Sequence, residues 1–155
     1  MHRMSTIRSL FSHFVPPGAP RQHGPDQEET AQEGSWIAGR LLRKVLVVDD
    51  EEDLAILAEA LLISEGLEVV VANSAIAALE ILAQDQDIDA IFSDVMMPGM
   101  TGLQLADAVR EMYPRVKIVL TSGYTMPSLL ADRETRYLFA SKPYRIDTVM
   151  KLLRS

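Results

Sequence analysis

Short apolar runs rich in valine and isoleucine alternate with segments of helical periodicity, and this alternation limits the fold of the chain most. Runs of this length that lack polar alternation are typical of strands buried on both faces of a sheet. The helical segments supply the crossover connections that parallel strands need. The sequence therefore predicts an α/β fold with a doubly wound, five-stranded parallel sheet. The runs occupy residues 44–49, 67–72, 89–94, 116–122 and 137–143.

Helical periodicity marks most of the segments between the runs. The first helix follows an acidic stretch and ends at Gly66, and Ser74 is placed to cap the second. Thr101 or Gly102 opens the third helix, which Pro114 ends, and residues 146–153 form the last. Residues 124–135 have a poor pattern and predict a loop with one or two helical turns.

Apolar residues at helical spacing predict which face of two helices points inward. For the first helix, we expect the inner face to consist of Leu54, Leu57, Ala58, Leu61 and Leu62. For the third helix, we expect it to consist of Leu105, Val109 and Met112.

The beginning of the chain differs in composition from the rest. Residues 15–34 are rich in proline, glycine, glutamine and glutamate and offer little to bury, so they cannot offset the entropy of ordering. Apolar residues at helical spacing within 7–14 fit a docking or membrane-surface helix, but a segment without fixed structure is the simpler interpretation. We expect a disordered extension over 1–41 and one domain over 42–155, with no output domain.

Charge and composition argue against several classes of protein. The formal net charge is −7, whereas proteins that bind nucleic acid have basic surfaces. No apolar run approaches the roughly 18 residues of a membrane-spanning helix. Cysteine is absent, which excludes disulfides and thiolate metal sites. We expect a cytoplasmic protein without a membrane span and without nucleic acid as a partner.

Polar side chains gather where the predicted strands end. Asp49 and Asp50 end the first strand, Asp94 the third, Thr121-Ser122 the fourth, and Lys142 follows the fifth. The carboxyl ends of parallel strands share one edge of a sheet, where ligands of such folds bind. Three clustered carboxylates repel one another unless a cation lies among them. Oxygen ligands without His or Cys favour Mg²⁺.

This set of groups fits phosphoryl transfer. A carboxylate can attack phosphorus, and Asp94 is placed for that role. Mg²⁺ and Lys142 would offset the charge on the transferring group, and the Ser122 hydroxyl could donate to a phosphate oxygen. The sequence has no glycine-rich phosphate loop, so we do not expect a nucleotide as the phosphoryl donor.

The segments VLVVDDEEDL, DAIFSDVMMPGMTGLQLA, IVLTSGY and SKPY resemble, in this order, the signatures of the receiver domain of bacterial two-component response regulators. The resemblance covers about residues 43–155. It implies a flavodoxin-like strand order 2-1-3-4-5 with helices on both faces, as in chemotaxis receivers. It also implies a signalling protein and not an enzyme, phosphorylated by a sensor histidine kinase or a histidine phosphotransfer protein. The signal would leave through a changed affinity for an unspecified protein partner, and a homodimer is left open.

The resemblance assigns the acceptor site residue by residue. Asp94 is the phosphoacceptor, and Asp49, Asp50 and Asp94 bind Mg²⁺ together with the backbone carbonyl of Met96. Lys142 contacts the phosphoryl group and precedes a proline that is usually cis in this family.

The resemblance also assigns switch and lifetime residues. Ser122, with Thr121 as the alternative, takes the place of the switch hydroxyl, and Phe139 that of the aromatic residue that moves inward on activation. Met96 and Tyr124 occupy the positions that tune hydrolysis, and neither has a carboxylate or amide to orient water. We therefore expect a phosphoaspartate that lasts minutes or longer.

Two other functions are compatible with parts of this pattern. A degenerate receiver would serve only as a docking module. A phosphatase with an aspartate nucleophile needs a second acid two residues after it, where this chain has Met96. The segment before the fifth strand lacks the usual small-residue turn, which puts the extent of the fourth helix in doubt.

Overall fold

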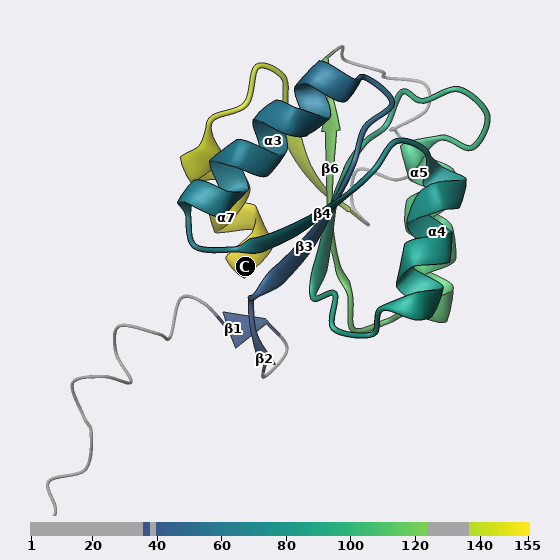
Figure 1. Cartoon of the computed structure of the whole chain (residues 1–155), viewed down its shortest axis with the longest axis horizontal. Helices are drawn as coiled ribbons and strands as arrows, with labels where there is room; N and C mark the ends of the chain where they lie inside the picture. Colours follow the sequence, from purple (N-terminus) through teal and green to yellow (C-terminus); the bar gives the residue numbers. More distant parts are fainter. Residues whose placement is uncertain (1–35, 38–39, 124–136) are drawn as a thin grey trace, which may run out of the picture. The chain divides into compact units, whose positions relative to one another are not determined.

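Five parallel strands form the central sheet in the order β4-β3-β5-β6-β7 (Figure 1). The structure is a computed structural model that describes residues 36–37, 40–123 and 137–155. In chain order the strands lie second, first, third, fourth and fifth, so the expected order 2-1-3-4-5 is confirmed. Each strand falls within its predicted apolar run. Their bounds are β3 Lys44–Val48, β4 Glu68–Ala72, β5 Ala90–Asp94, β6 Lys117–Ser122 and β7 Leu138–Ser141.

Helices cover both faces of this sheet (Figure 1). On one face lie α3 (Glu52–Ser64) and α7 (Ile146–Arg154), and on the other lie α4 (Ala75–Gln84) and α5 (Gly102–Met112). The predicted α/β, doubly wound fold class is confirmed.

Side-chain caps fix the starts of two helices. The Ser74 hydroxyl accepts a hydrogen bond from the backbone N–H of Ala77 at 3.1 Å and caps α4. Thr101 caps α5 by accepting from the Gln104 N–H at 3.2 Å, and the Gln104 side chain accepts from the Thr101 N–H at 3.0 Å. This capping box satisfies backbone donors that a helix start leaves unpaired. It makes Gly102 the first residue of α5, next to the loop that follows β5.

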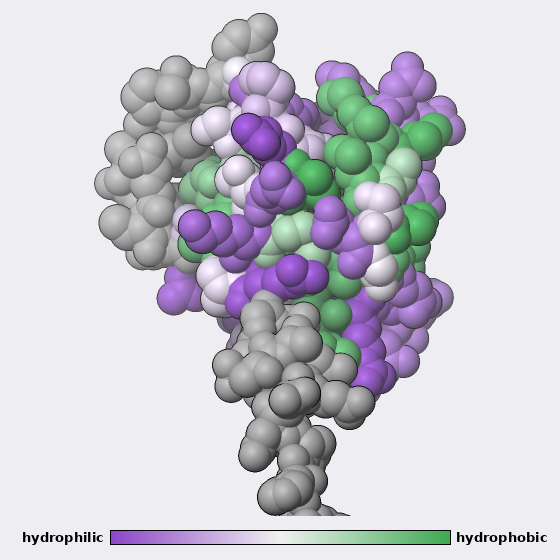
Figure 2. Space-filling view, turned by 90° about the vertical axis from the view of Figure 1, so that its left-hand side faces the viewer, coloured by the Kyte–Doolittle hydropathy of each residue, from purple (hydrophilic) through white to green (hydrophobic). Residues whose placement is uncertain are grey.

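The predicted inner face of α3 is wrong in part. The helix buries Ala55, Ala58 and Leu62, whereas Leu57 is 52% exposed. The helix is apolar almost all round, so periodicity alone does not select its inner face, and the two alanines face the core. Ile63 is also exposed. Figure 2 faces the side of the molecule where α3 and α7 lie and shows apolar surface between hydrophilic patches.

The predicted inner face of α5 is wrong at one residue. Leu105 and Val109 are fully buried, but Met112 is 54% exposed. Met112 is the last residue of the helix, and the C-cap residue Tyr113 packs against the core instead.

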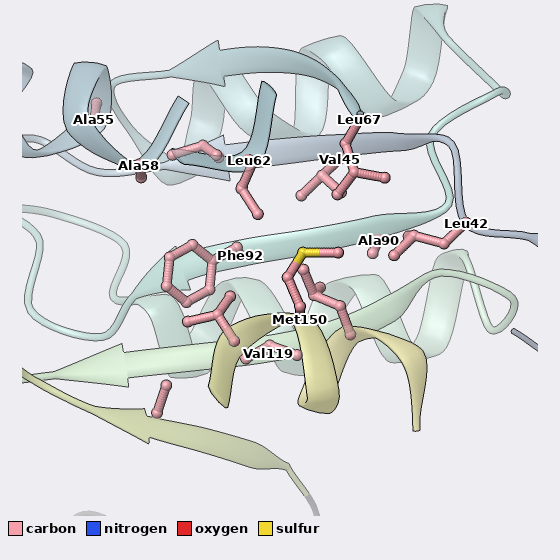
Figure 3. Packing of buried hydrophobic residues seen from close by; sticks show 14 residues of the cluster. Leu42, Val45, Ala55, Ala58, Leu62, Leu67, Ala90, Phe92, Val119 and Met150 are labelled. Carbon is pink, nitrogen blue, oxygen red and sulfur yellow. The ribbon is translucent and has the colours of Figure 1, made fainter. Parts of the chain in front are cut away.

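Two apolar layers fill the space between sheet and helices. On the side of α3 and α7, Phe92 and Val119 of the sheet pack with Leu62 and Met150 of the helices (Figure 3). On the other side, Leu105 of α5 belongs to a second buried cluster with residues of α4. Because both faces of the strands are buried, the ends of the strands are where the sheet meets solvent.

A short antiparallel pair precedes the main sheet. The strands β1 (Trp36–Ile37) and β2 (Arg40–Leu41) pair with each other at the end of the predicted extension. Residues 1–35, 38–39 and 124–136 lie outside the described residues, so the disordered extension and the fourth helix stay predictions. No helix in the described part of the chain is long and apolar enough to cross a membrane.

Candidate functional site

Three carboxylates meet at the carboxyl edge of the sheet. Asp94 is the last residue of β5, and Asp49 and Asp50 directly follow β3. One carboxylate oxygen from each residue lies within 4.8 Å of the other two. Asp49 and Asp94 are buried, with 6% and 5% exposure, whereas Asp50 is exposed. The predicted cluster of acids therefore forms, with two members inside and one at the surface.

The electrostatics of Asp49 agree with this crowding. Burial raises the pKa of its carboxyl group above the usual value, and the charges of Asp94 and Asp50 act in the same direction. The backbone N–H of Glu51, which donates to Asp49 Oδ1 at 2.9 Å, and the Lys142 charge oppose the shift. A cation among the carboxylates would offset the repulsion between their charges.

Lys142 supplies a positive charge next to the cluster. Its Nζ lies 3.1 Å from Asp94 Oδ2, to which it donates a hydrogen bond, and 3.9 Å from Asp49 Oδ2. The backbone N–H of Lys142 donates to the Ser122 carbonyl at 2.9 Å, which joins the end of β7 to the end of β6. The peptide bond between Lys142 and Pro143 is cis, as the family resemblance implied.

The remaining oxygen of Asp94 is held by the loop after β5. Asp94 Oδ1 accepts a hydrogen bond from the Met96 N–H at 3.2 Å. After this loop the chain comes back to the end of β5, where the Gly102 N–H donates a hydrogen bond to the Val95 carbonyl at 2.9 Å. A Cβ atom on Gly102 would overlap the carbonyl oxygen of Asp94 and would lie 2.8 Å from its carbonyl carbon. The start of α5 can therefore approach β5 this closely only with glycine.

The two candidate switch hydroxyls lie at the end of β6. Thr121 pairs in register with Asp94, and Ser122 pairs one step further along with Ser141. Both side chains are buried. Among the residues that the structure describes, the Thr121 Oγ1 has no hydrogen-bond partner. Ser122 and its alternative Thr121 are thus both within the site region, and the choice between them stays a prediction.

The other predicted site residues differ in their surroundings. Phe139 of β7 is half-buried and packs against a cluster that contains Val95, the residue after Asp94. The Met96 side chain is 54% exposed. Tyr124 lies outside the described residues.

Two aromatic contacts were missed by the sequence analysis, one next to the site and one at the other end of β7. Tyr144 packs edge-on against Phe92, with ring centroids 5.1 Å apart. Burial raises the pKa of the Tyr144 hydroxyl, and the charges of Asp49 and Asp94 raise it further. Tyr137, before β7, donates a hydrogen bond to the Asp107 carboxylate of α5 at 2.5 Å. Tyr144 directly follows the SKP motif, and this position could have identified it from the sequence. Nothing in the sequence indicates the contact between Tyr137 and Asp107.

An apolar hollow adjoins the charged cluster. It has a volume of about 490 Å³. One wall consists of Leu54, Leu57 and Leu61 of α3, and Tyr144 contributes a further apolar side chain. Asp49 and Lys142 also line the hollow, so it leads from the surface of α3 to the acidic site.

The donor set fits a hard divalent cation. The three carboxylates offer only oxygen atoms, and Mg²⁺ is typically held by one or two carboxylates together with water and phosphate oxygens. The site is therefore chemically suited to Mg²⁺, and the Met96 carbonyl remains a predicted further ligand.

Comparisons with known proteins agree on one family. The family model described as response regulator receiver domain matches residues 45–154. A putative NtrX-like response regulator of Rickettsia bellii is 32% identical over 114 residues, which are 71% of this chain and 24% of that protein. The transcriptional regulatory protein CpxR of Escherichia coli is 38% identical over 81 residues, 52% of this chain and 34% of that protein.

Solved structures show the same similarity. The chemotaxis protein CheY4 of Vibrio cholerae is 30% identical, with a TM-score of 0.65, over 73% of this chain and 97% of that chain. The chain thus corresponds to nearly all of that structure, but it spans only 24% and 34% of the two curated relatives. The similarity accordingly concerns a domain and not the whole of those longer proteins.

Proposed function

Because this chain belongs to the response regulator receiver family, we propose that it receives a signal by accepting a phosphoryl group on Asp94. The observation that carries the proposal is a buried carboxylate that belongs to a cluster of three acids suited to a metal ion and that also accepts a hydrogen bond from an ammonium group. Asp94 belongs to both arrangements: its Oδ2 lies 3.1 Å from the Lys142 Nζ, and its carboxylate groups with those of Asp49 and Asp50.

The proposed transfer breaks one bond to phosphorus and forms another. An oxygen of Asp94 attacks the phosphorus of a phosphohistidine in a histidine kinase or a histidine phosphotransfer protein. The phosphorus–nitrogen bond breaks, and its electron pair stays on the imidazole nitrogen of the donor. Lys142, already beside the attacking carboxylate, neutralises the charge of the arriving phosphoryl oxygens.

Asp49, Asp50 and Asp94 would hold Mg²⁺ in this proposal, together with the Met96 carbonyl. Bound Mg²⁺ would supply positive charge that stabilises the transferring phosphoryl oxygens. Ser122, or Thr121 in its place, would then donate a hydrogen bond to the acyl phosphate, and Phe139 would move with it. The output would be a changed affinity for a protein partner in the cytoplasm.

The apolar hollow suggests where the donor protein binds. It joins the exposed Leu57 of α3 to Asp49 and Lys142 of the acidic site. A donor that covers this surface would bury apolar area and place its histidine next to Asp94. We therefore expect the face of α3, and not that of α4, to contact the donor.

The first experiment tests acceptance of the phosphoryl group. The chain is incubated with acetyl phosphate and Mg²⁺, and its intact mass is measured. We expect a gain of one phosphoryl group that disappears with a chelator and in Asp94→Asn. The isosteric asparagine keeps the size of the side chain and removes the nucleophile. An unmodified wild-type chain would contradict the proposal.

The second experiment separates docking from chemistry. Leu57→Asp should slow phosphorylation by a protein donor but leave phosphorylation by acetyl phosphate unchanged, because only the protein donor uses the surface of α3. The matched control is Ile76→Asp on α4, whose side chain is 60% exposed. Equal rates for both variants with the protein donor would contradict docking on α3.

A further inference from the structure

Met96 is both fixed next to the acceptor and open to solvent. Its backbone N–H donates to Asp94 Oδ1 at 3.2 Å, so the residue is tied to the carboxylate that receives the phosphoryl group. Its side chain is nevertheless 54% exposed. The next residue, Met97, is only 7% exposed and packs in the core on the side of α4 and α5. Two adjacent methionines therefore differ sharply in access to a dissolved reagent.

An exposed thioether is a target for peroxides. The sulfur takes one oxygen atom from hydrogen peroxide and water is released, so that the sulfur is oxidised by two electrons and the peroxide is reduced. The product is a sulfoxide, a polar group that accepts hydrogen bonds, in place of an apolar one. Methionine sulfoxide reductases reverse this change.

We propose that Met96 is an oxidation-sensitive site that shortens the lifetime of the phosphoaspartate, an inference that rests on the proposed function of Asp94. Hydrolysis requires a water oxygen to bond to phosphorus while the bond from phosphorus to the Asp94 oxygen breaks and a proton passes to solvent. The thioether of Met96 offers water no strong acceptor. In this proposal, a sulfoxide oxygen on the residue whose backbone N–H is bonded to Asp94 Oδ1 accepts a hydrogen bond from water and orients that water toward the acyl phosphate.

The test measures the decay of the phosphorylated chain before and after peroxide. Wild type, Met96→Leu and Met112→Leu are treated with dilute hydrogen peroxide, peptide mapping locates the sulfoxides, and each protein is then phosphorylated with acetyl phosphate. Removal of the acetyl phosphate starts the decay. Oxidised wild type should lose its phosphoryl group about two- to tenfold faster than untreated wild type, the effect of one additional hydrogen bond in the transition state.

The two variants separate Met96 from the other methionines. Met112 is equally exposed at 54%, but it lies at the far end of α5, so Met112→Leu should respond to peroxide like the wild type. Met96→Leu keeps every other methionine, so its own decay rate should be the same with and without peroxide. Treatment with sulfoxide reductases of both stereochemical classes should restore the wild-type rate.

The outcomes distinguish this inference from the proposed function. An unchanged or slower decay of oxidised wild type, an equal acceleration in Met96→Leu, or a map without oxidation at Met96 would overturn the inference alone. A chain that takes up no phosphoryl group before peroxide treatment would overturn the proposed function and the inference with it.

Discussion

Replacing Gly102 with alanine tests whether β5 and α5 are in contact as closely as the structure shows. A Cβ atom at this position would overlap the Asp94 carbonyl oxygen and lie 2.8 Å from the Val95 Cα. All of these are backbone atoms, so no side chain can rotate away, and the start of α5 must move. This movement would also weaken the 2.9 Å hydrogen bond from the Gly102 N–H to the Val95 carbonyl.

The expected magnitude follows from two opposing terms. Overpacking costs typically 1–3 kcal/mol, and because the clash here is with backbone atoms we expect a cost of about 3 kcal/mol. Alanine has a better helix propensity than glycine by up to about 1 kcal/mol. We therefore expect Gly102→Ala to lose about 2–3 kcal/mol of unfolding free energy, a large part of a typical total of about 5–15 kcal/mol.

Urea unfolding followed by circular dichroism measures this loss. The matched control is Gly123→Ala, at which a Cβ atom would meet the Lys142 Cδ at 3.8 Å, an ordinary contact. The control should stay within about 0.5 kcal/mol of the wild type. A Gly102→Ala chain as stable as the control would refute the close approach. The variant should also accept the phosphoryl group more slowly, because its Asp94 is displaced.

Three further predictions concern how single substitutions change the stability of the protein. Tyr137→Phe removes the hydrogen bond to the Asp107 carboxylate and should cost about 1–2 kcal/mol in urea unfolding, and an unchanged midpoint would show that the bond contributes nothing. Asp49→Asn removes one crowded charge, so without Mg²⁺ it should be more stable than the wild type. At a Mg²⁺ concentration ten times Kd, the free energy of unfolding of the wild type, measured by thermal unfolding, should rise by about 1.4 kcal/mol, and that of the variant by much less. Equal increases would exclude Asp49 as a ligand. Leu105→Ala should cost about 2–5 kcal/mol in urea, because this fully buried side chain would leave a cavity, and a smaller loss would mean that the core is loosely packed.

The strands and the acidic cluster could be predicted because local sequence determines them. Valine-rich runs indicate strands that are buried on both faces, and parallel strands end at one edge of their sheet. Asp49 follows β3 and Asp94 ends β5, so the topology alone brings these two residues together. The capping residues Ser74 and Thr101 were predictable for a similar reason, since a cap acts on backbone donors a few residues away.

The features that sequence did not predict depend on tertiary contacts. In α3 apolar side chains lie almost all round the helix, so the burial of Ala55 in place of Leu57 is decided by how closely the helix packs on the sheet. The Tyr137 hydroxyl donates a hydrogen bond to Asp107, which lies 30 positions away in the sequence, and no sequence pattern predicts such a pair. The apolar hollow at Lys142 likewise arises from three separate segments.

The most direct test of the central claim locates the acyl phosphate. The chain is phosphorylated in the presence of Mg²⁺ and treated with borohydride, which reduces an acyl phosphate to an alcohol, and peptides are then analysed by mass spectrometry. The reduced residue should be Asp94, and neither Asp49 nor Asp50 should be reduced. Reduction at either of those two, or reduction at none of the three after phosphorylation, would contradict the assignment of Asp94 as the phosphoryl acceptor.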